Sequence, residues 1–138
     1  MKLFLDTDVL LDVLVQRAPH SIPASRIWSR VETRVVEGYI SAVSFNNAHY
    51  VIRRAAGRQA AHEALKLLRD IFRLVPLDEE ILQRAIDSDS SDFEDAIQFF
   101  SALRAQADCL LTRNVRHFPA EPLSVLTPEQ FLKIHSIL

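Results

Sequence analysis

The chain has 138 residues, of which 49% are hydrophobic and 25% are charged, and its formal net charge is −2. This length and composition predict one globular domain over residues 1–138, large enough to bury about two-thirds of its unfolded surface. One cysteine excludes an internal disulfide and a multi-cysteine zinc site, and two glycines exclude a glycine-rich phosphate loop and a dinucleotide fingerprint. The near-neutral charge gives no overall attraction to polyanions, so a nucleic-acid site would have to be a local basic patch.

The N-terminal sequence argues against export and against membrane insertion. Asp6 and Asp8 interrupt the apolar run that a signal peptide would need, and no apolar run approaches the roughly 18 residues of a membrane span. Together with the single cysteine, these features predict a cytoplasmic protein with no membrane contact.

Short apolar runs alternate along the chain with stretches of helical periodicity. In chain order, the predicted elements are a strand over 2–5, a helix over 8–15, a helix from Ala24 to near Gly38, a strand over 38–43, a helix over 45–56 capped by Ser44, a helix over 58–72, a strand over 73–77, a helix over 79–86, a helix over 93–107, strands over 108–112 and 123–127, and a helix over 128–135. Strands separated by helices predict an α/β fold with a largely parallel sheet.

Polar side chains follow two of the predicted strands directly. Asp6 follows the first strand, and Thr112, Arg113 and Asn114 follow the DCLL strand. In parallel α/β sheets, ligands bind beyond the carboxyl ends of the strands. The sequence therefore predicts a functional site formed by these two strand ends.

The segment DSDSSDFEDA (87–96) concentrates acidic residues at the start of the helix over 93–107. Ser91 and Glu94 match an S-x-x-E capping box, which makes Asp92 and Asp95 less necessary for the cap. For Asp92, capping and a site role remain open, whereas for Asp95 a site role is favoured. A calcium loop is a poor match, because no glycine stands at its sixth position.

Carboxylates gathered at one sheet edge repel one another unless a cation neutralises them. Hard oxygen ligands select Mg²⁺ or Mn²⁺, and such an ion suits phosphodiester hydrolysis because it activates water and stabilises charge on phosphate. In such a site Thr112 or Asn114 could hold the attacking water or contact a ligand residue.

Four stretches of the chain together resemble the PIN-domain ribonucleases, and most closely the VapC-like toxins of prokaryotic toxin–antitoxin modules. They are FLDTDVLLDVL, SFNNAHYVIRR, SDFEDAIQFFSALRAQADCLLTRNVRHF and LTPEQFL. The resemblance covers nearly the whole chain, and residues 91–118 are its most specific part. It implies a compact three-layer α/β/α sandwich around a mostly parallel sheet, with acidic residues that bind Mg²⁺ or Mn²⁺. It also implies cleavage of RNA, often tRNA or ribosomal RNA, a cognate antitoxin and a homodimer.

The resemblance also assigns roles to particular residues. Asp6 matches the first acid of the family, Asp95 the acid of the long helix, and Asp92 an accessory acid. Asn114 matches a position that is aspartate or asparagine in the family, and Asp8 falls where asparagine or a small polar residue is common.

Two positions depart from the family pattern. Asn47 stands where many members have a glutamate, and His117 stands where many have a further aspartate. Asp6, Asp92 and Asp95 then remain as the principal acids, and Asp8 could compensate for the missing charge. We expect weaker metal binding than in a four-acid site, so a degenerate PIN domain that binds RNA or a protein without cleavage is an alternative.

Basic residues adjoin the predicted site, and Arg113, Arg116 and His117 are the candidates for RNA contact. A second cluster, Arg53, Arg54 and Arg58, is left without an assigned role. The other histidines are expected at the surface, and Asp12 is expected to be solvated or to face a partner.

A second enzyme class shares the D-x-D opening, namely the haloacid-dehalogenase-type phosphotransferases. In that interpretation Asp6 would be a nucleophile and Asp8 a general acid. The interpretation requires a lysine shortly before a second acidic pair, and the only lysines are Lys2, Lys66 and Lys133. We therefore favour a metal-dependent ribonuclease.

Overall fold

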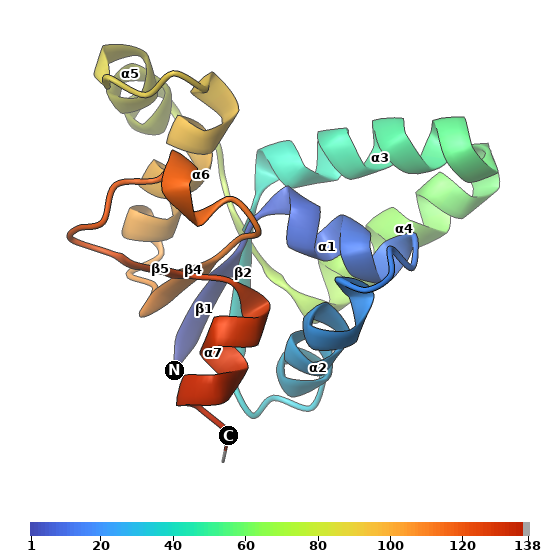
Figure 1. The fold of residues 1–138 in the computed structure, drawn as a ribbon. Helices are drawn as coiled ribbons and strands as arrows, with labels where there is room; N and C mark the ends of the chain where they lie inside the picture. The colour runs from blue at the N-terminus through green and yellow to red at the C-terminus, as the bar shows by residue number, and fades with distance from the viewer. Residues whose placement is uncertain (137–138) are drawn as a thin grey trace.

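A computed structural model describes residues 1–136 and contains a five-stranded sheet with helices on both faces (Figure 1). Its elements are β1 (Lys2–Leu5), α1 (Thr7–Leu14), α2 (Ser21–Glu32), β2 (Glu37–Ser41), α3 (Ala42–Ala56), α4 (Arg58–Ile71), β3 (Arg73–Val75), α5 (Glu79–Asp87), α6 (Phe93–Arg104), β4 (Cys109–Leu111), a short 3-10 helix (Val115–His117), β5 (Ser124–Leu126) and α7 (Pro128–Ile134). Within residues 1–136, no helix combines the length and the apolar composition needed to cross a membrane.

The strands are all parallel and lie in the order β3-β2-β1-β4-β5. In the centre, Leu3 of β1 lies opposite Gly38 of β2 on one side and opposite Cys109 of β4 on the other. The chain runs outward from β1 in both directions, so the strand order reverses between β1 and β4. Such a reversal leaves a crevice at the carboxyl ends of those two strands.

Alternating side chains of the strands pack into two separate hydrophobic cores, one on each face of the sheet. Leu3 and Leu5 point to one face, where they pack with α1, α2, α3, α4 and α7, whereas Phe4 points to the other face and packs with α5 and α6. Leu111 and Leu110 of β4 divide in the same way. A strand buried on both faces needs a continuous apolar run, which explains the KLFL and CLL segments. The α/β/α sandwich expected from the sequence is confirmed.

The helices α3 and α4 form an antiparallel hairpin that projects beyond the sheet (Figure 1). Gly57 joins them with φ +94° and ψ 173°, a conformation that is essentially restricted to glycine. A Cβ atom at this position would have no neighbour within 4 Å, so the backbone conformation, and not space, calls for glycine.

Two predicted helix boundaries are wrong. The helix α2 runs from Ser21 to Glu32, and Gly38 does not end it but lies inside β2. A Cβ atom at Gly38 would come within 2.6 Å of a Val31 methyl carbon and 2.8 Å of the Phe72 ring. This glycine therefore allows close packing of helices on the sheet, a requirement that a local pattern does not reveal.

Two predicted helix caps are also different. The N-terminus of α3 is capped by Ser41, whose hydroxyl accepts from the Val43 N–H, whereas Ser44 is fully buried inside the helix. The helix α6 is capped by Asp92, not by a Ser91 capping box, since the Asp92 carboxylate accepts from the Asp95 N–H at 3.0 Å.

Candidate functional site

Asp6 ties together the carboxyl ends of the two central strands. It follows β1, caps α1 by accepting from the Thr7 N–H at 2.8 Å, and accepts from the Thr112 hydroxyl at 2.8 Å. Its own N–H donates to the Leu111 carbonyl at the end of β4. Both carboxylate oxygens are thus held in place, and the side chain is only 5% exposed.

The surroundings of Asp6 disfavour its charged form. Burial raises the pKa of this carboxyl to about 8, and the nearby charges of Asp8 and Asp95 add to that effect. The hydrogen bonds from Thr112 and Thr7 lower the pKa but do not outweigh burial. A buried carboxyl that accepts two hydrogen bonds and has acids as neighbours would be stabilised by a bound cation.

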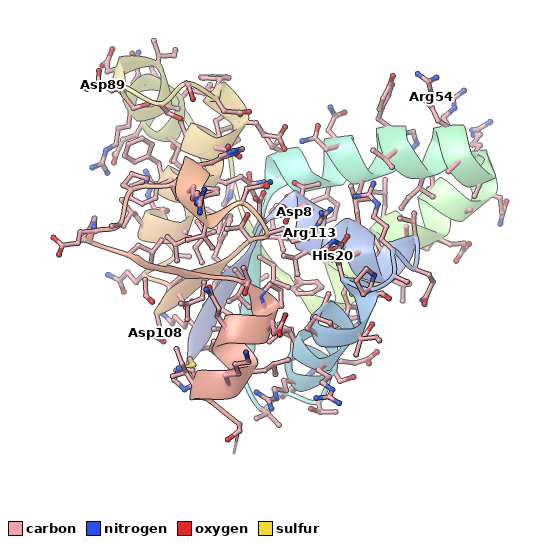
Figure 2. The ribbon with its side chains drawn as sticks, viewed as in Figure 1. Asp8, His20, Arg54, Asp89, Asp108 and Arg113 are labelled. Carbon is pink, nitrogen blue, oxygen red and sulfur yellow. The ribbon has the colours of Figure 1, made fainter. Side chains whose placement is uncertain are left out.

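Asp8 lies one residue inside α1 and faces the loop after β4. Its Oδ2 accepts from the Arg113 N–H at 3.3 Å and from the Asn114 side-chain amide at 3.2 Å, while its Oδ1 is buried without a hydrogen-bond partner. Asp8 and Arg113 lie at the centre of the molecule, where α1 meets the sheet (Figure 2). Burial raises the pKa of Asp8, and this raising outweighs the lowering by Arg113. The predicted compensating acid is therefore a member of the site.

Asp95 approaches the same strand ends from the first turn of α6. Its Oδ2 lies 3.2 Å from Nδ1 of His117, whose side chain is 58% exposed. Partial burial raises the pKa of Asp95, Asp92 adds to the increase, and His117 opposes it. Asp92 itself caps the helix, so the two possibilities left open for it overlap: it caps α6 and also places a charge beside Asp95. Asp89 lies away from Asp8 (Figure 2) but lines a recess together with Asp95.

Glu94 joins the site although the sequence assigned it to a capping box. Its Oε1 accepts from the Asn47 amide at 2.7 Å, which links α3 to α6. Desolvation among its neighbours raises the pKa of Glu94, and the charges of Asp92 and Asp95 raise it further. A carboxylate therefore lies beside Asn47 after all, although it comes from α6. Its position next to Asp95 was the only local signal for it.

A buried polar cluster fixes the helices that carry the acids. The hydroxyls of Thr7 and Ser44 lie 2.8 Å apart, and the Gln98 amide donates to both, at 2.9 and 3.2 Å. All three side chains are buried, and they come from α1, α3 and α6. No local sequence pattern indicates this cluster, because its members are separated by 37 and 54 residues.

The expectation that Asp12 is solvated is wrong. Asp12 is 1% exposed, and Nε of Arg113 lies 2.8 Å from its Oδ2, with Arg17 at 4.0 Å from its Oδ1. No hydrogen bond is directed at either oxygen of Asp12, so the contact is an ion pair. Arg113, predicted to contact RNA, therefore has its guanidinium directed into the protein. Of the predicted RNA-contacting residues, Arg116 and His117 are exposed.

Arg116 and His117 lie at a surface recess beside Asp95. The recess has a volume of about 410 Å³, and Phe99 and Phe118 contribute to its apolar wall. This arrangement places two basic side chains directly next to an acid of the site, as the TRNVRHF motif suggested. Asn114 lies on the opposite side of the loop, at Asp8.

The acidic side chains fit a divalent cation that keeps much of its water. Among residues 1–136, no three His, Cys, Asp or Glu side chains are placed to ligate one ion together. Mg²⁺ needs only one or two carboxylates, since water completes its octahedral shell. Burial raises the pKa of Asp6, Asp8 and Asp95, Asp8 and Asp95 raise that of Asp6 further, and Asp8 Oδ1 is a buried oxygen without a partner. One or two of these three residues, together with water, are the candidates to hold Mg²⁺ or Mn²⁺.

An all-parallel α/β/α sandwich with carboxylates at the ends of its central strands is the architecture of several phosphate-handling protein classes. Within that class, a family model described as PIN domain matches residues 2–116. The chain belongs to the PIN-domain family. No curated protein sequence matches it significantly.

Solved structures with the same fold include VapC toxins. VapBC-1 of nontypeable Haemophilus influenzae has a TM-score of 0.70 at 17% identity, over 94% of this chain and 99% of that one. A toxin–antitoxin complex from Klebsiella pneumoniae has a TM-score of 0.68 at 21% identity, over 91% and 96%. Mycobacterium tuberculosis VapC20, a sarcin–ricin loop cleaving toxin, has a TM-score of 0.65 at 17% identity, over 78% and 86%. At these identities the comparison establishes a shared fold.

Proposed function

We propose that this protein is a metal-dependent endoribonuclease that cleaves RNA phosphodiester bonds. The observation that carries the proposal is the convergence of Asp6, Asp8 and Asp95 on the carboxyl ends of β1 and β4, with the pKa of each raised. Buried carboxyls whose pKa is raised gain most from a bound cation, and one solved structure of the same fold is a sarcin–ricin loop cleaving toxin.

In this proposal Asp6, Asp92 and Asp95 are the catalytic acids, and the metal would be held by Asp6 and Asp95, with Asp8 as the further candidate ligand. A bound Mg²⁺ or Mn²⁺ would supply an activated water and neutralise charge on the phosphate. Thr112 fixes Asp6 through its hydroxyl, and Asn114 fixes Asp8 through its amide. His117 is exposed and contacts Asp95 through Nδ1, so its other ring nitrogen is left for contact with the substrate.

The proposal is tested with purified wild-type protein, Asp6→Asn and Asp95→Asn, incubated with total tRNA or ribosomal RNA and Mn²⁺ or Mg²⁺. Each substitution removes a ligand charge, so we expect a loss of cleavage of about 100-fold or more. Asp70→Asn removes an exposed acid of α4 and is expected to cleave like the wild type. Undiminished cleavage by both site variants, with unchanged circular dichroism, would contradict the proposal.

The same proposal extends to a toxin role in the cytoplasm, with a cognate antitoxin and a homodimer. What supports it is that structures of the same fold include VapBC and other toxin–antitoxin complexes. The expected result is that induced expression stops growth, that Asp95→Asn does not, and that co-expression of the protein encoded next to it restores growth. Unaffected growth with abundant active protein would argue against a toxin.

A second candidate function is RNA or protein binding without cleavage. The observation in its favour is that Asn47 brings no charge of its own to the site, and its amide is already bonded to Glu94. Titration of Mn²⁺ by calorimetry separates the two functions. If RNA is retained while no metal binds at millimolar concentration, the non-cleaving function is the better one.

A further inference from the structure

A recess between α1 and α3 opens next to the acidic site and has no role in the function proposed above. It has a volume of about 310 Å³. Two of its lining residues, Asp8 and Glu94, belong to the acidic site. The others that matter for its chemistry are Leu11, Asn47, Arg17 and Tyr50. The recess thus leads from the carboxylates to an aromatic ring and a cation.

Tyr50 presents an ordered aromatic ring at the surface of this recess. Tyr50 is 59% exposed, which is a high value for a large aromatic residue. Nη1 of Arg54 donates to the Tyr50 hydroxyl at 2.8 Å, and the guanidinium carbon lies 5.6 Å from the ring centroid. The arginine one turn along α3 therefore fixes the orientation of the ring while much of its surface stays accessible. Such a ring is suited to stack on a planar ligand.

The cations on this side of the molecule are available to an anionic ligand. Among the residues that the structure describes, Arg53, Arg54 and Arg58 form no ion pair, and Arg17 approaches a carboxylate only to 4.0 Å. Arg54 lies towards the outer end of α3 and points away from the sheet (Figure 2). A basic surface thus begins where the acidic site ends.

The residues lie along one line on the helix surface. Asn47, Tyr50 and Arg54 occupy positions i, i+3 and i+7 of α3, so they share one face. Asn47 contacts Glu94 at the acidic site, and Arg54 lies about 10 Å further along the helix axis. A chain of alternating planar and anionic groups could follow this line outward from the acids.

We propose that this recess binds the nucleotide next to the cleaved bond of a single-stranded RNA, with its base stacked on Tyr50 and its phosphates bound by Arg17 and Arg54. The inference rests on the proposed ribonuclease function and adds the conformation of the substrate. Bases expose their faces for stacking only where the RNA is unpaired, so the recess selects a single strand or a loop. Arginine forks match phosphate oxygens, which completes the complementarity to a nucleotide.

The test titrates the full chain, carrying Asp95→Asn to prevent cleavage, into fluorescein-labelled oligouridylate or oligoadenylate of about ten nucleotides and follows the anisotropy. Tyr50→Ala is expected to weaken binding about tenfold, because the stacking of one base is lost, whereas Tyr50→Phe stays within about twofold. Arg54→Ala is expected to reduce the slope of log affinity against log salt by about 0.7, the value for one phosphate contact on a single strand. Arg26→Ala, a change of the same charge at an exposed position of α2, should leave that slope unchanged.

The outcomes separate the inference from the function on which it rests. If the wild type cleaves RNA and Asp6→Asn does not, while Tyr50→Ala and Arg54→Ala bind RNA like Arg26→Ala, then the ribonuclease function stands and the inference fails. The inference is also overturned if a fully paired duplex binds with equal affinity and that affinity depends equally on Tyr50 and Arg54. It is overturned as well if Tyr50→Ala binds RNA normally and loses only the binding of a protein partner. If the folded protein neither binds nor cleaves RNA, both proposals fail together.

Discussion

The buried position of Asp6 makes the stability of the fold depend on pH. Asp6 is almost completely buried, and its carboxyl is surrounded by acids, so the folded protein binds a proton there that the unfolded chain releases near pH 4. Between about pH 4 and pH 8 the folded state therefore holds more protons at Asp6 than the unfolded state does. Stability must fall as the pH rises through this range, and the loss is complete above the folded pKa of about 8.

The first prediction concerns the pH dependence of Asp6→Asn without metal. The asparagine carries no charge, so its cost to stability is the same at every pH, whereas the cost of the wild-type aspartate grows as the pH rises. We expect the stability of Asp6→Asn relative to wild type to improve by about 3–4 kcal/mol between pH 5 and pH 8. Thermal melts in a chelator measure it, with Asp70→Asn as an exposed control. A difference that does not change with pH would show that Asp6 is charged in the folded apoprotein.

Single residues also mark the limit of prediction from the sequence. Asp6, Asp8, Thr112 and Asn114 could be grouped in advance, because each follows or nearly follows a strand of a parallel sheet. Asp12 could not, since its closest partner is Arg113, about a hundred residues away along the chain. A buried aspartate and a solvated one have the same local pattern on a helix.

At the scale of elements, α1 and the loop after β4 are joined by two acids of one helix. Asp8 accepts from the Arg113 N–H, and Asp12, one helical turn further on, faces the guanidinium of the same residue. Arg113 therefore positions the loop that carries Thr112 and Asn114 against α1. This role in positioning replaces the RNA contact expected for Arg113 as the main function of its side chain.

The second prediction is that Asp12 and Arg113 are strongly coupled. Arg113→Met keeps the apolar stem but leaves a buried carboxylate without its cation, so we expect a loss of about 3 kcal/mol. Asp12→Asn with Arg113→Met should lose less than the sum of the single changes, with a coupling of about 1–3 kcal/mol in urea unfolding. The exposed pair Lys133 and Glu129 should couple by less than about 0.5 kcal/mol. Additive effects of Asp12→Asn and Arg113→Met would contradict the ion pair.

The third prediction is that Gly38 and Gly57 are required for different reasons, Gly38 for close packing and Gly57 for its backbone conformation. Gly38→Ala places a methyl group against Val31 and Phe72, so we expect a loss of about 2 kcal/mol that Val31→Ala partly restores. Gly57→Ala meets no neighbour but must adopt φ +94°, which costs about 2 kcal/mol and has no packing rescue. Denaturant unfolding of the two single variants and of the double variant Gly38→Ala with Val31→Ala measures these effects. A double variant that is no more stable than Gly38→Ala would refute the packing explanation.

At the scale of the whole molecule, the alternation of strands and helices was enough to predict an α/β fold with a parallel sheet, and the family resemblance implied the three-layer sandwich. The central strands β1 and β4 are short and apolar because they are covered on both faces, and that pattern is visible in KLFL and CLL without any tertiary information. A local sequence pattern reveals neither the order of the strands nor the contact of α1, α3 and α6. The Thr7, Ser44 and Gln98 cluster that holds these helices has no local signature, because its hydrogen bonds join residues that are 37, 54 and 91 positions apart.

The architecture of the whole molecule sets how metal binding must depend on pH. Burial raises the pKa of Asp6, Asp8 and Asp95, the charges of Asp8 and Asp95 raise that of Asp6 further, and a cation can bind only the charged forms. With a pKa of about 8, Asp6 is mainly protonated at pH 6.5. Binding at that pH must therefore release a proton, whereas binding well above the pKa releases almost none.

The fourth prediction follows from this linkage. We expect the affinity for Mn²⁺ to be about tenfold lower at pH 6.5 than at pH 8, since one proton must leave on binding. Calorimetry at pH 6.5 in two buffers of different ionisation enthalpy should show the released proton as a difference in apparent heat. Asp6→Asn should bind Mn²⁺ more weakly at both pH values and with much less pH dependence. An affinity that is the same at both pH values, with no buffer-dependent heat, would mean that the ion binds away from Asp6.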